Sequence, residues 1–173
     1  MDALKIDINN IRSIESIPYL PIEFFKNNSV KTTEFQPEII FESSGTTSEK
    51  TSRHYVRDLT LYQKSFLSCF QSFYGEPSEW CIIALLPGYL ERQNSSLVYM
   101  ADSLIKHSRQ AASGFYLYDH EKLYKVLCAC EFKRQRVLLI GVTFALLDFA
   151  ERYSLELNHT TFMETVGMKG RRE

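Results

Sequence analysis

Two features that would point to a membrane or a nucleic-acid partner are missing from this sequence. No apolar run reaches the roughly 18 residues that a membrane span needs, and Met1 to Asn10 contain no apolar core of signal-peptide length. Positive and negative charges almost cancel, with 20 Lys and Arg against 21 Asp and Glu. No overall field therefore attracts nucleic acid or an anionic surface. We expect a cytoplasmic protein with no membrane span and no nucleic-acid partner.

Cysteine is scarce, and its spacing does not suit a zinc site or a disulfide framework. The four cysteines are Cys69, Cys81, Cys128 and Cys130. They form no C-x-x-C pair, which predicts free, mostly buried thiols in a reducing compartment. His107, His120 and His159 have no second His or Cys at ligand spacing. We expect these histidines at helix caps or on the surface, and we predict no metal site made by the chain itself.

Glycine is also scarce, with seven residues in 173. Neither G-x-x-x-x-G-K-[ST] nor G-x-G-x-x-G occurs, which excludes the two commonest glycine-rich phosphate loops. No serine has glycines both two before and two after it, so the nucleophile elbow of a Ser-His-Asp hydrolase is absent.

The sequence does contain regularly alternating apolar segments. Hydrophobic residues make up 45% of the chain, which is enough for the core of a single domain. Continuous apolar runs predict strands, and apolar residues three or four positions apart predict helices that follow Asp58, Ser95 or Ser96, and Asp119 or His120. The expected strands are 39–41, 80–86, 114–118, 137–142 and 160–163, and the expected helices are 59–74, 96–105, 120–130 and 144–153. This order predicts an α/β fold with a mostly parallel β-sheet and helices on both faces.

Two parts of unequal size are expected along the chain. Pro18 and Pro21 prevent one continuous helix near the N-terminus, and six apolar residues around them suggest an ordered arm packed on the core. We therefore divide the chain into an N-terminal arm, 1–35, and an α/β phosphate-loop domain, 36–173.

A hydroxyl-rich loop follows the first expected strand. It consists of Ser43, Ser44, Gly45, Thr46, Thr47 and Ser48, with Lys50 just beyond. Gly45 permits close approach of the backbone to a ligand, and the hydroxyl groups add donors beside successive backbone N–H groups. Such a concave arrangement binds oxyanions, although a plain solvated loop fits the composition as well.

The loop resembles the ATP-phosphate loop of the adenylate-forming, acyl-CoA synthetase-like superfamily. The continuation Thr51-Ser-Arg-His-Tyr-Val56 is similar to the acyl-protein synthetase (LuxE-type) branch of that superfamily. Three further stretches resemble blocks of the same family in the same order: Leu86 to Met100, Gly141 to Ala150 and Glu164 to Arg172. The resemblance implies that the chain is part of the large N-terminal domain of an adenylate-forming enzyme.

The resemblance also implies a reaction and its ligands. ATP with Mg2+ would bind at Ser43 to Ser48 and Lys50, and a carboxylic acid, with fatty acids as the expected class, would form an acyl-adenylate. The acyl group would then pass to a protein thiol, coenzyme A or another nucleophile. Ser52 and His54 would lie at the exit of the loop. The resemblance places Gly167, Met168, Lys169 and Gly170 near the adenine and acyl pocket, where a type II turn fits equally well. It assigns no catalytic side chain.

Some features of the family pattern are different or absent. The loop is one residue shorter before Lys50, and Val166 stands where the family generally has a glycine. The later Tyr-Gly-x-Thr-Glu motif, which helps to hold magnesium, does not occur. We therefore expect the chain to be the front portion of a longer, truncated enzyme and to be inactive alone. The alternative is a non-catalytic nucleotide- or partner-binding domain that retains the fold.

Overall fold

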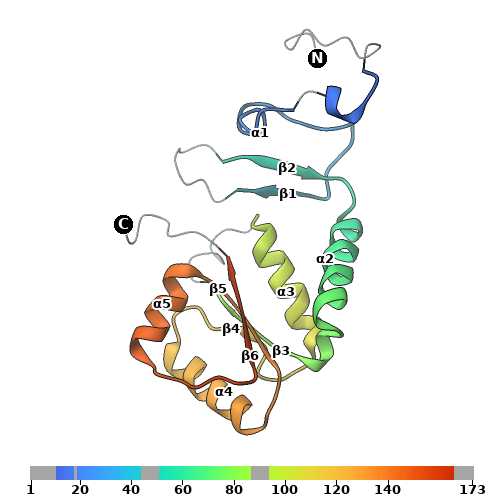
Figure 1. Cartoon of the computed structure of the whole chain (residues 1–173). Helices are drawn as coiled ribbons and strands as arrows, with labels where there is room; N and C mark the ends of the chain where they lie inside the picture. The colour runs from blue at the N-terminus through green and yellow to red at the C-terminus, as the bar shows by residue number, and fades with distance from the viewer. Residues whose placement is uncertain (1–10, 18, 44–50, 87–93, 166–173) are drawn as a thin grey trace.

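The body of the molecule is a four-stranded parallel sheet between two layers of helices (Figure 1). The computed structural model describes residues 11–17, 19–43, 51–86 and 94–165. Within them the sheet is formed by β3 (Cys81–Leu85), β4 (Gly114–Phe115), β5 (Val137–Val142) and β6 (Thr160–Thr165). Its strand order is β4-β3-β5-β6, and every pairing is parallel. The predicted α/β class is confirmed.

The two central strands form the core because their side chains are apolar on both faces. Every residue of β3 and β5 is buried, and they pair in register from Cys81 opposite Val137 to Leu85 opposite Gly141. A parallel strand covered by helices on both sides needs such a continuous apolar run.

Four helices cover the sheet, with α2 (Leu59–Tyr74) and α3 (Ser96–Ser108) on one face and α4 (His120–Phe132) and α5 (Thr143–Arg152) on the other (Figure 1). Three begin at predicted caps: Asp58 accepts a hydrogen bond from Thr60 N, Ser95 from Val98 N and Asp119 from Lys122 N. These side-chain oxygens satisfy N–H groups that the first turn leaves without a helical partner. No helix in the described ranges is long and apolar enough to cross a bilayer.

A separate two-stranded antiparallel sheet precedes the body. It consists of β1 (Ile39–Glu42) and β2 (Arg53–Val56), paired from Ile39 opposite Val56 to Glu42 opposite Arg53. The first expected strand therefore exists but lies outside the parallel sheet. Its partner β2 was not predicted, because its residues are exposed or half-buried and lack a clear apolar alternation.

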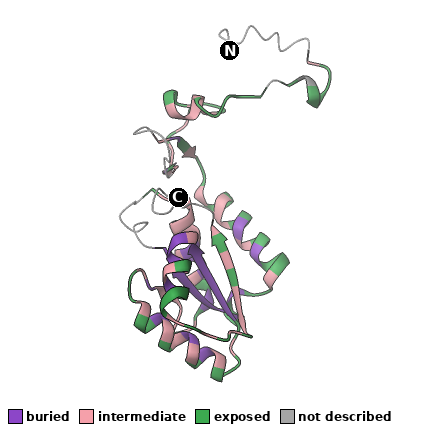
Figure 2. Ribbon diagram, turned by 60° about the vertical axis from the view of Figure 1, so that its left-hand side comes forward, coloured by how far each residue is buried: buried purple, intermediate pink, exposed green. Residues whose placement is uncertain are grey.

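The N-terminal arm contacts this hairpin rather than the parallel sheet. The rings of Phe25, in α1 (Phe24–Asn27), and His54 stack with centroids 5.0 Å apart. Earlier in the arm, around η3 (Ile14–Ser16), large apolar side chains are exposed, including Tyr19 at 97%. Figure 2 shows this segment extending away from the body. Within the described part of the arm, α1 therefore contacts the hairpin while the apolar side chains around η3 are exposed, and the division of the chain into arm and domain stays a prediction.

The third expected strand is shorter than predicted. The sequence predicted residues 114–118, but β4 ends at Phe115. Tyr116 N still donates to Ala84 O, at 3.0 Å, and Leu117 then adopts a left-handed conformation with φ 47°, which a strand cannot continue through.

Buried and half-buried polar groups join the connections at the amino edge of the sheet, where its strands begin. Ser108 Oγ donates to Trp80 O at 2.7 Å and lies 2.6 Å from Ser113 Oγ, which accepts from Ile82 N. Nearby, the carboxylate of Glu131 accepts from the backbone N of Asn158 and of His159, at 3.0 and 2.8 Å. These bonds hold the segments before β3, β4 and β6 in place.

Candidate functional site

The hydroxyl-rich loop joins the two strands of the hairpin, and hydrogen bonds link its described ends. Ser43 N donates to Ser52 O, and Ser52 N donates to Ser43 Oγ, both at 3.0 Å. Ser52 is only 5% exposed. The structure therefore shows where the loop leaves and rejoins the fold. The remaining predicted phosphate-binding residues, Ser44, Gly45, Thr46, Thr47, Ser48 and Lys50, lie outside the described residues.

The hairpin is attached at the carboxyl edge of the parallel sheet, where its strands end. Glu42 N donates to Asn94 O at 2.9 Å, and Asn94 lies just before the cap of α3, on the connection that follows β3. Phe41 packs against the rings of Tyr62 and Tyr99, with centroids 5.2 and 5.8 Å away. Because Tyr62 and Tyr99 come from the beginnings of α2 and α3, this aromatic cluster fixes the base of the loop near the end of β3 (Figure 1).

The hydroxyl of Tyr62 joins the two helices against which Phe41 packs. It donates to Ser96 O at 3.2 Å, and burial raises the pKa of Tyr62 above its usual value of 10. The phenol therefore stays protonated at neutral pH and remains a donor. It serves the structure of the hairpin base rather than proton transfer.

A crevice for ligands is expected where β3 and β5 end side by side. The chain leaves β3 toward α3 on one face and leaves β5 toward α5 on the other (Figure 1). Open α/β sheets bind ligands at such a point, because the diverging connections leave space between them. The hairpin loop starts from the β3 side of this point.

On the β5 side, a hydroxyl and a carboxylate meet at the same edge. Thr143, the first residue of α5, donates from Oγ1 to Glu164 Oε1 at 2.6 Å. Gly141 precedes them, and a Cβ there would lie 2.6 Å from Leu146 Cγ. The missing side chain therefore allows α5 to pack closely against the end of β5. The predicted residues Gly167, Met168, Lys169 and Gly170 follow β6 but lie outside the described residues.

The predicted residues at the loop exit have different surroundings. Ser52 is buried in the closure described above, whereas His54 is exposed on β2 with its ring against Phe25. The stacking of its ring on Phe25 gives His54 a structural role in the hairpin. In register, His54 lies opposite Phe41, so it belongs to the hairpin and not to the end of a parallel strand.

The other three histidines occupy different positions. His107 is exposed in the last turn of α3, and His120 begins α4 with its ring against Phe149. Burial, aided by Arg152, lowers the pKa of His120. His159 Nδ1 lies 3.0 Å from Glu131 Oε2, so this histidine is part of the amino-edge structure.

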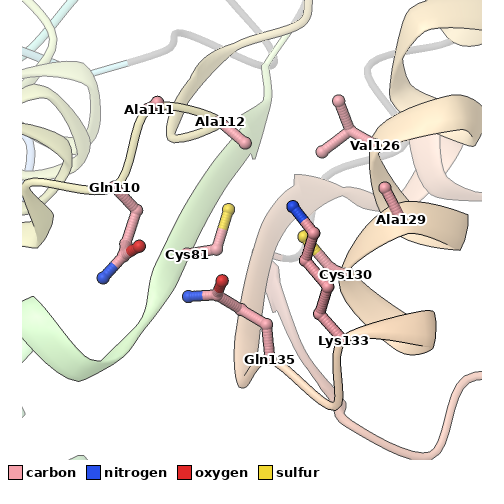
Figure 3. A pocket seen from close by; sticks show the side chains of 9 residues that line it. All are labelled: Cys81, Gln110, Ala111, Ala112, Val126, Ala129, Cys130, Lys133 and Gln135. Carbon is pink, nitrogen blue, oxygen red and sulfur yellow. The ribbon is translucent and has the colours of Figure 1, made fainter.

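A small cavity lies at the amino edge beside two of the thiols. It has a volume of about 190 Å³ and is lined by Cys81, Cys130, Lys133 and Gln135, among others (Figure 3). Burial raises the pKa of the Cys81 thiol to about 12 and also raises that of Cys130. Both sulfurs are therefore protonated at neutral pH and poor nucleophiles. This cavity is also smaller than the roughly 300 Å³ of ordinary ligand pockets.

Two residues of the carboxyl edge were not predicted as site residues. Asn94 acts through its main-chain oxygen, which gives no signal in its residue type. Glu164 belongs to a stretch that was singled out, but its partner Thr143 is 21 residues away, and only the pairing of β5 with β6 brings them together. Within the described ranges, no group of three or more His, Cys, Asp or Glu side chains is placed to hold a metal ion.

Comparisons of the chain with protein-family models, with curated proteins and with solved structures found no match.

Proposed function

We propose that this chain is the phosphate-loop portion of an ATP-dependent acyl-activating ligase. Such an enzyme forms an acyl-adenylate from a carboxylic acid and ATP and passes the acyl group to a thiol or another nucleophile. The proposal is supported by the resemblance of the loop and its neighbouring stretches to LuxE-type acyl-protein synthetases. The observation that carries it is the anchoring of the loop at the carboxyl edge, through Ser43, Ser52 and Asn94.

In this proposal the loop binds the β- and γ-phosphates of ATP. Backbone N–H groups of Ser44 to Ser48 and hydroxyls of Ser43 to Ser48 would donate to the phosphate oxygens, and Lys50 would neutralise part of their charge. The N-termini of α3 and α5 lie at the same edge, and their helix dipoles favour negative charge there. Magnesium would be held largely by the phosphate oxygens of ATP, as is usual for this ion.

The chemical step needs few groups from the protein. A carboxylate oxygen of the acid forms a bond to the α-phosphorus while the bond from that phosphorus to pyrophosphate breaks. The carboxylate and ATP are both anions and must approach each other. The contribution of the loop is therefore to position the phosphates and to stabilise the charge on the leaving pyrophosphate.

Carboxylate-dependent exchange of labelled pyrophosphate into ATP tests this reaction. Because this chain alone is expected to be inactive, exchange is measured with the longer enzyme of which it would be the front portion. We expect exchange with at least one member of a panel of fatty and aromatic acids, and a decrease of about 100-fold in the double variant Thr46→Ala/Thr47→Ala, the size of effect typical for lost phosphate donors. The matched control is Thr32→Ala/Thr33→Ala, which changes two adjacent exposed threonines in the arm. Absence of exchange with every acid, or equal loss in both double variants, would refute the ligase assignment.

The second candidate function is that of a non-catalytic nucleotide- or partner-binding domain. The exposed apolar side chains of the arm favour it, because exposed apolar surface of this kind commonly contacts a partner. They are Ile14, Ile17, Tyr19, Leu20 and Ile22. This candidate predicts that the protein binds ATP without catalysing pyrophosphate exchange. Alternatively, it predicts that the arm binds a partner protein whether or not exchange occurs.

A further inference from the structure

A second hollow lies at the amino edge of the body, between α2 and the last turn of α3. It has a volume of about 470 Å³, within the range of ordinary small-molecule sites. Leu67 of α2 and Pro77 of η4 (Pro77–Glu79) supply its apolar part. The polar lining is Lys64, Ser68, Gln71, Glu76, Ser78, His107 and Arg109. We refer to this hollow as the α2–α3 cleft.

Basic side chains outnumber acidic ones around the α2–α3 cleft. Lys64 and Arg109 carry permanent positive charges at neutral pH, and neither is in an ion pair with any of the residues that the structure describes. The carboxylate of Glu76 is the acidic member, and the amide of Gln71 lies 3.3 Å from both of its oxygens. The lining is therefore net positive, and the hydroxyls of Ser68 and Ser78 add neutral donors.

The third basic side chain, His107, is already oriented. Its Nδ1 lies 2.7 Å from Ser103 O, a carbonyl oxygen that can only accept a hydrogen bond. Nδ1 therefore carries the proton and donates, which fixes the orientation of the ring at the wall of the α2–α3 cleft.

Arg109 occupies a backbone position that is costly for an arginine. It follows α3 as its C-cap, in the left-handed conformation with φ 55°. Glycine is the usual residue at such a helix end, because it has no Cβ to crowd the backbone. The chain nevertheless places a long cationic side chain there, at the wall of the α2–α3 cleft. A strained non-glycine residue beside a cavity is an observation that points to function.

We propose that the α2–α3 cleft binds a small oxyanion with several negative charges, carried on phosphoryl or carboxyl groups. The guanidinium fork of Arg109 pairs with two oxygens at once, and Lys64 adds a point charge. The cleft lies at the opposite edge of the sheet from the hydroxyl-rich loop. The inference does not depend on the proposed function, because it rests on other residues.

Titration of the protein with pyrophosphate, and separately with citrate, followed through backbone amide NMR shifts, tests this site. We expect saturable shifts at Ser68, Gln71 and Ser78. Stronger binding of pyrophosphate would identify a phosphoryl ligand, and stronger binding of citrate a carboxylate ligand. Because pyrophosphate can also bind the hydroxyl-rich loop, the titration is repeated with Thr46→Ala/Thr47→Ala, which should leave these three shifts unchanged.

Two glycine substitutions, each at a left-handed backbone position, test the role of Arg109. Arg109→Gly removes the side chain while relieving the left-handed strain, so the fold should be kept and the affinity should fall about tenfold, the loss of one charged contact. Arg134→Gly makes the same change at another left-handed position, φ 52°, after α4 and away from the cleft. Glu76→Gln should raise the affinity, since it removes the opposing charge. Absence of saturable shifts at the three amides, or equal affinity in Arg109→Gly and Arg134→Gly, would overturn the proposal.

Discussion

At the amino edge of the parallel sheet, partly or fully buried hydrogen bonds hold the connections, whereas at the carboxyl edge the connections present hydroxyl groups and an exposed carboxylate. Ser108 and Glu131 each accept or donate several bonds at the amino edge. At the carboxyl edge, Thr143 and Glu164 bond to each other at an exposed position. The difference indicates that Ser108 and Glu131 maintain the fold, whereas the Thr143–Glu164 pair contributes less to its stability.

Loss of the Glu131 carboxylate should have the largest effect on stability. Glu131→Ala would leave the N–H groups of Asn158 and His159 without their acceptor, and only 15% of the Glu131 side chain is exposed. We expect the free energy of unfolding to fall by about 3 kcal/mol, the range for buried partners of a charged group. Urea denaturation measures this change. A loss below about 0.5 kcal/mol, the level of an ordinary surface substitution, would show that the amino edge does not depend on these bonds.

The same carboxylate should make stability depend on pH. Burial alone would raise the pKa of Glu131, but hydrogen bonds from His159, Asn158 and Thr160 outweigh it and lower the pKa below its ordinary 4.5. As the pH falls, the Glu131 carboxylate therefore binds its proton at a higher pH in the unfolded chain than in the folded one. The stabilisation is complete above the unfolded pKa and is lost as the pH falls through the lower folded value. The free energy of unfolding, measured from pH 6 downward, should therefore decrease more steeply in the wild type than in Glu131→Gln. Parallel pH dependences of the two proteins would contradict this.

Ser108→Ala should have the next largest effect. The Ser108 side chain is fully buried, and its loss would remove the hydroxyl that donates to Trp80 O and the acceptor of Gln110 N. We expect a decrease of about 2 kcal/mol in the free energy of unfolding. The exposed Ser72 offers a matched control, since its hydroxyl donates to Ser68 O within its own helix. Equal changes for Ser108→Ala and Ser72→Ala would remove the distinction between a buried and an exposed hydroxyl.

Ser43→Ala should have a smaller effect on stability than either amino-edge change. It removes one hydrogen bond, from Ser52 N to Ser43 Oγ, but leaves the main-chain bond from Ser43 N to Ser52 O. We expect about 1 kcal/mol in urea denaturation. A loss as large as that of Glu131→Ala would place the hairpin base among the main stabilising features of the fold.

Thr143→Val should change stability least. The substitution keeps the shape of the side chain and removes only the bond to the exposed Glu164. A change within about 0.5 kcal/mol is expected, as for other surface positions. Thermal denaturation of this variant beside Ser108→Ala compares the two edges directly. A decrease above about 2 kcal/mol would mean that the Thr143–Glu164 pair is structural after all.

The local signals in the sequence predicted most of the body of the fold. Asp58, Ser95 and Asp119 cap the helices that they were expected to begin, and the continuous apolar runs form β3 and β5. These features were predictable because caps and apolar periodicity depend on neighbouring residues.

The features that the sequence did not reveal depend on distant partners. The hairpin is attached through Asn94 O, a main-chain atom whose use no residue type reveals. Glu131 and His159 are 28 residues apart and meet only after α4 and β6 are in place. The packing of the arm remains a prediction from its apolar composition, because composition does not specify what covers a segment. The hydroxyl-rich loop remains a prediction from its residues and its resemblance.

The most direct test of the ATP-phosphate assignment is the affinity of the chain for ATP and for AMP, measured by isothermal titration calorimetry with Mg2+ present. If the loop binds the β- and γ-phosphates, ATP should bind at least about tenfold more tightly than AMP, a difference of about 1.4 kcal/mol, and Thr46→Ala/Thr47→Ala should abolish that preference. Equal affinities for ATP and AMP in the wild type, or a preference that survives in the double variant, would contradict the assignment.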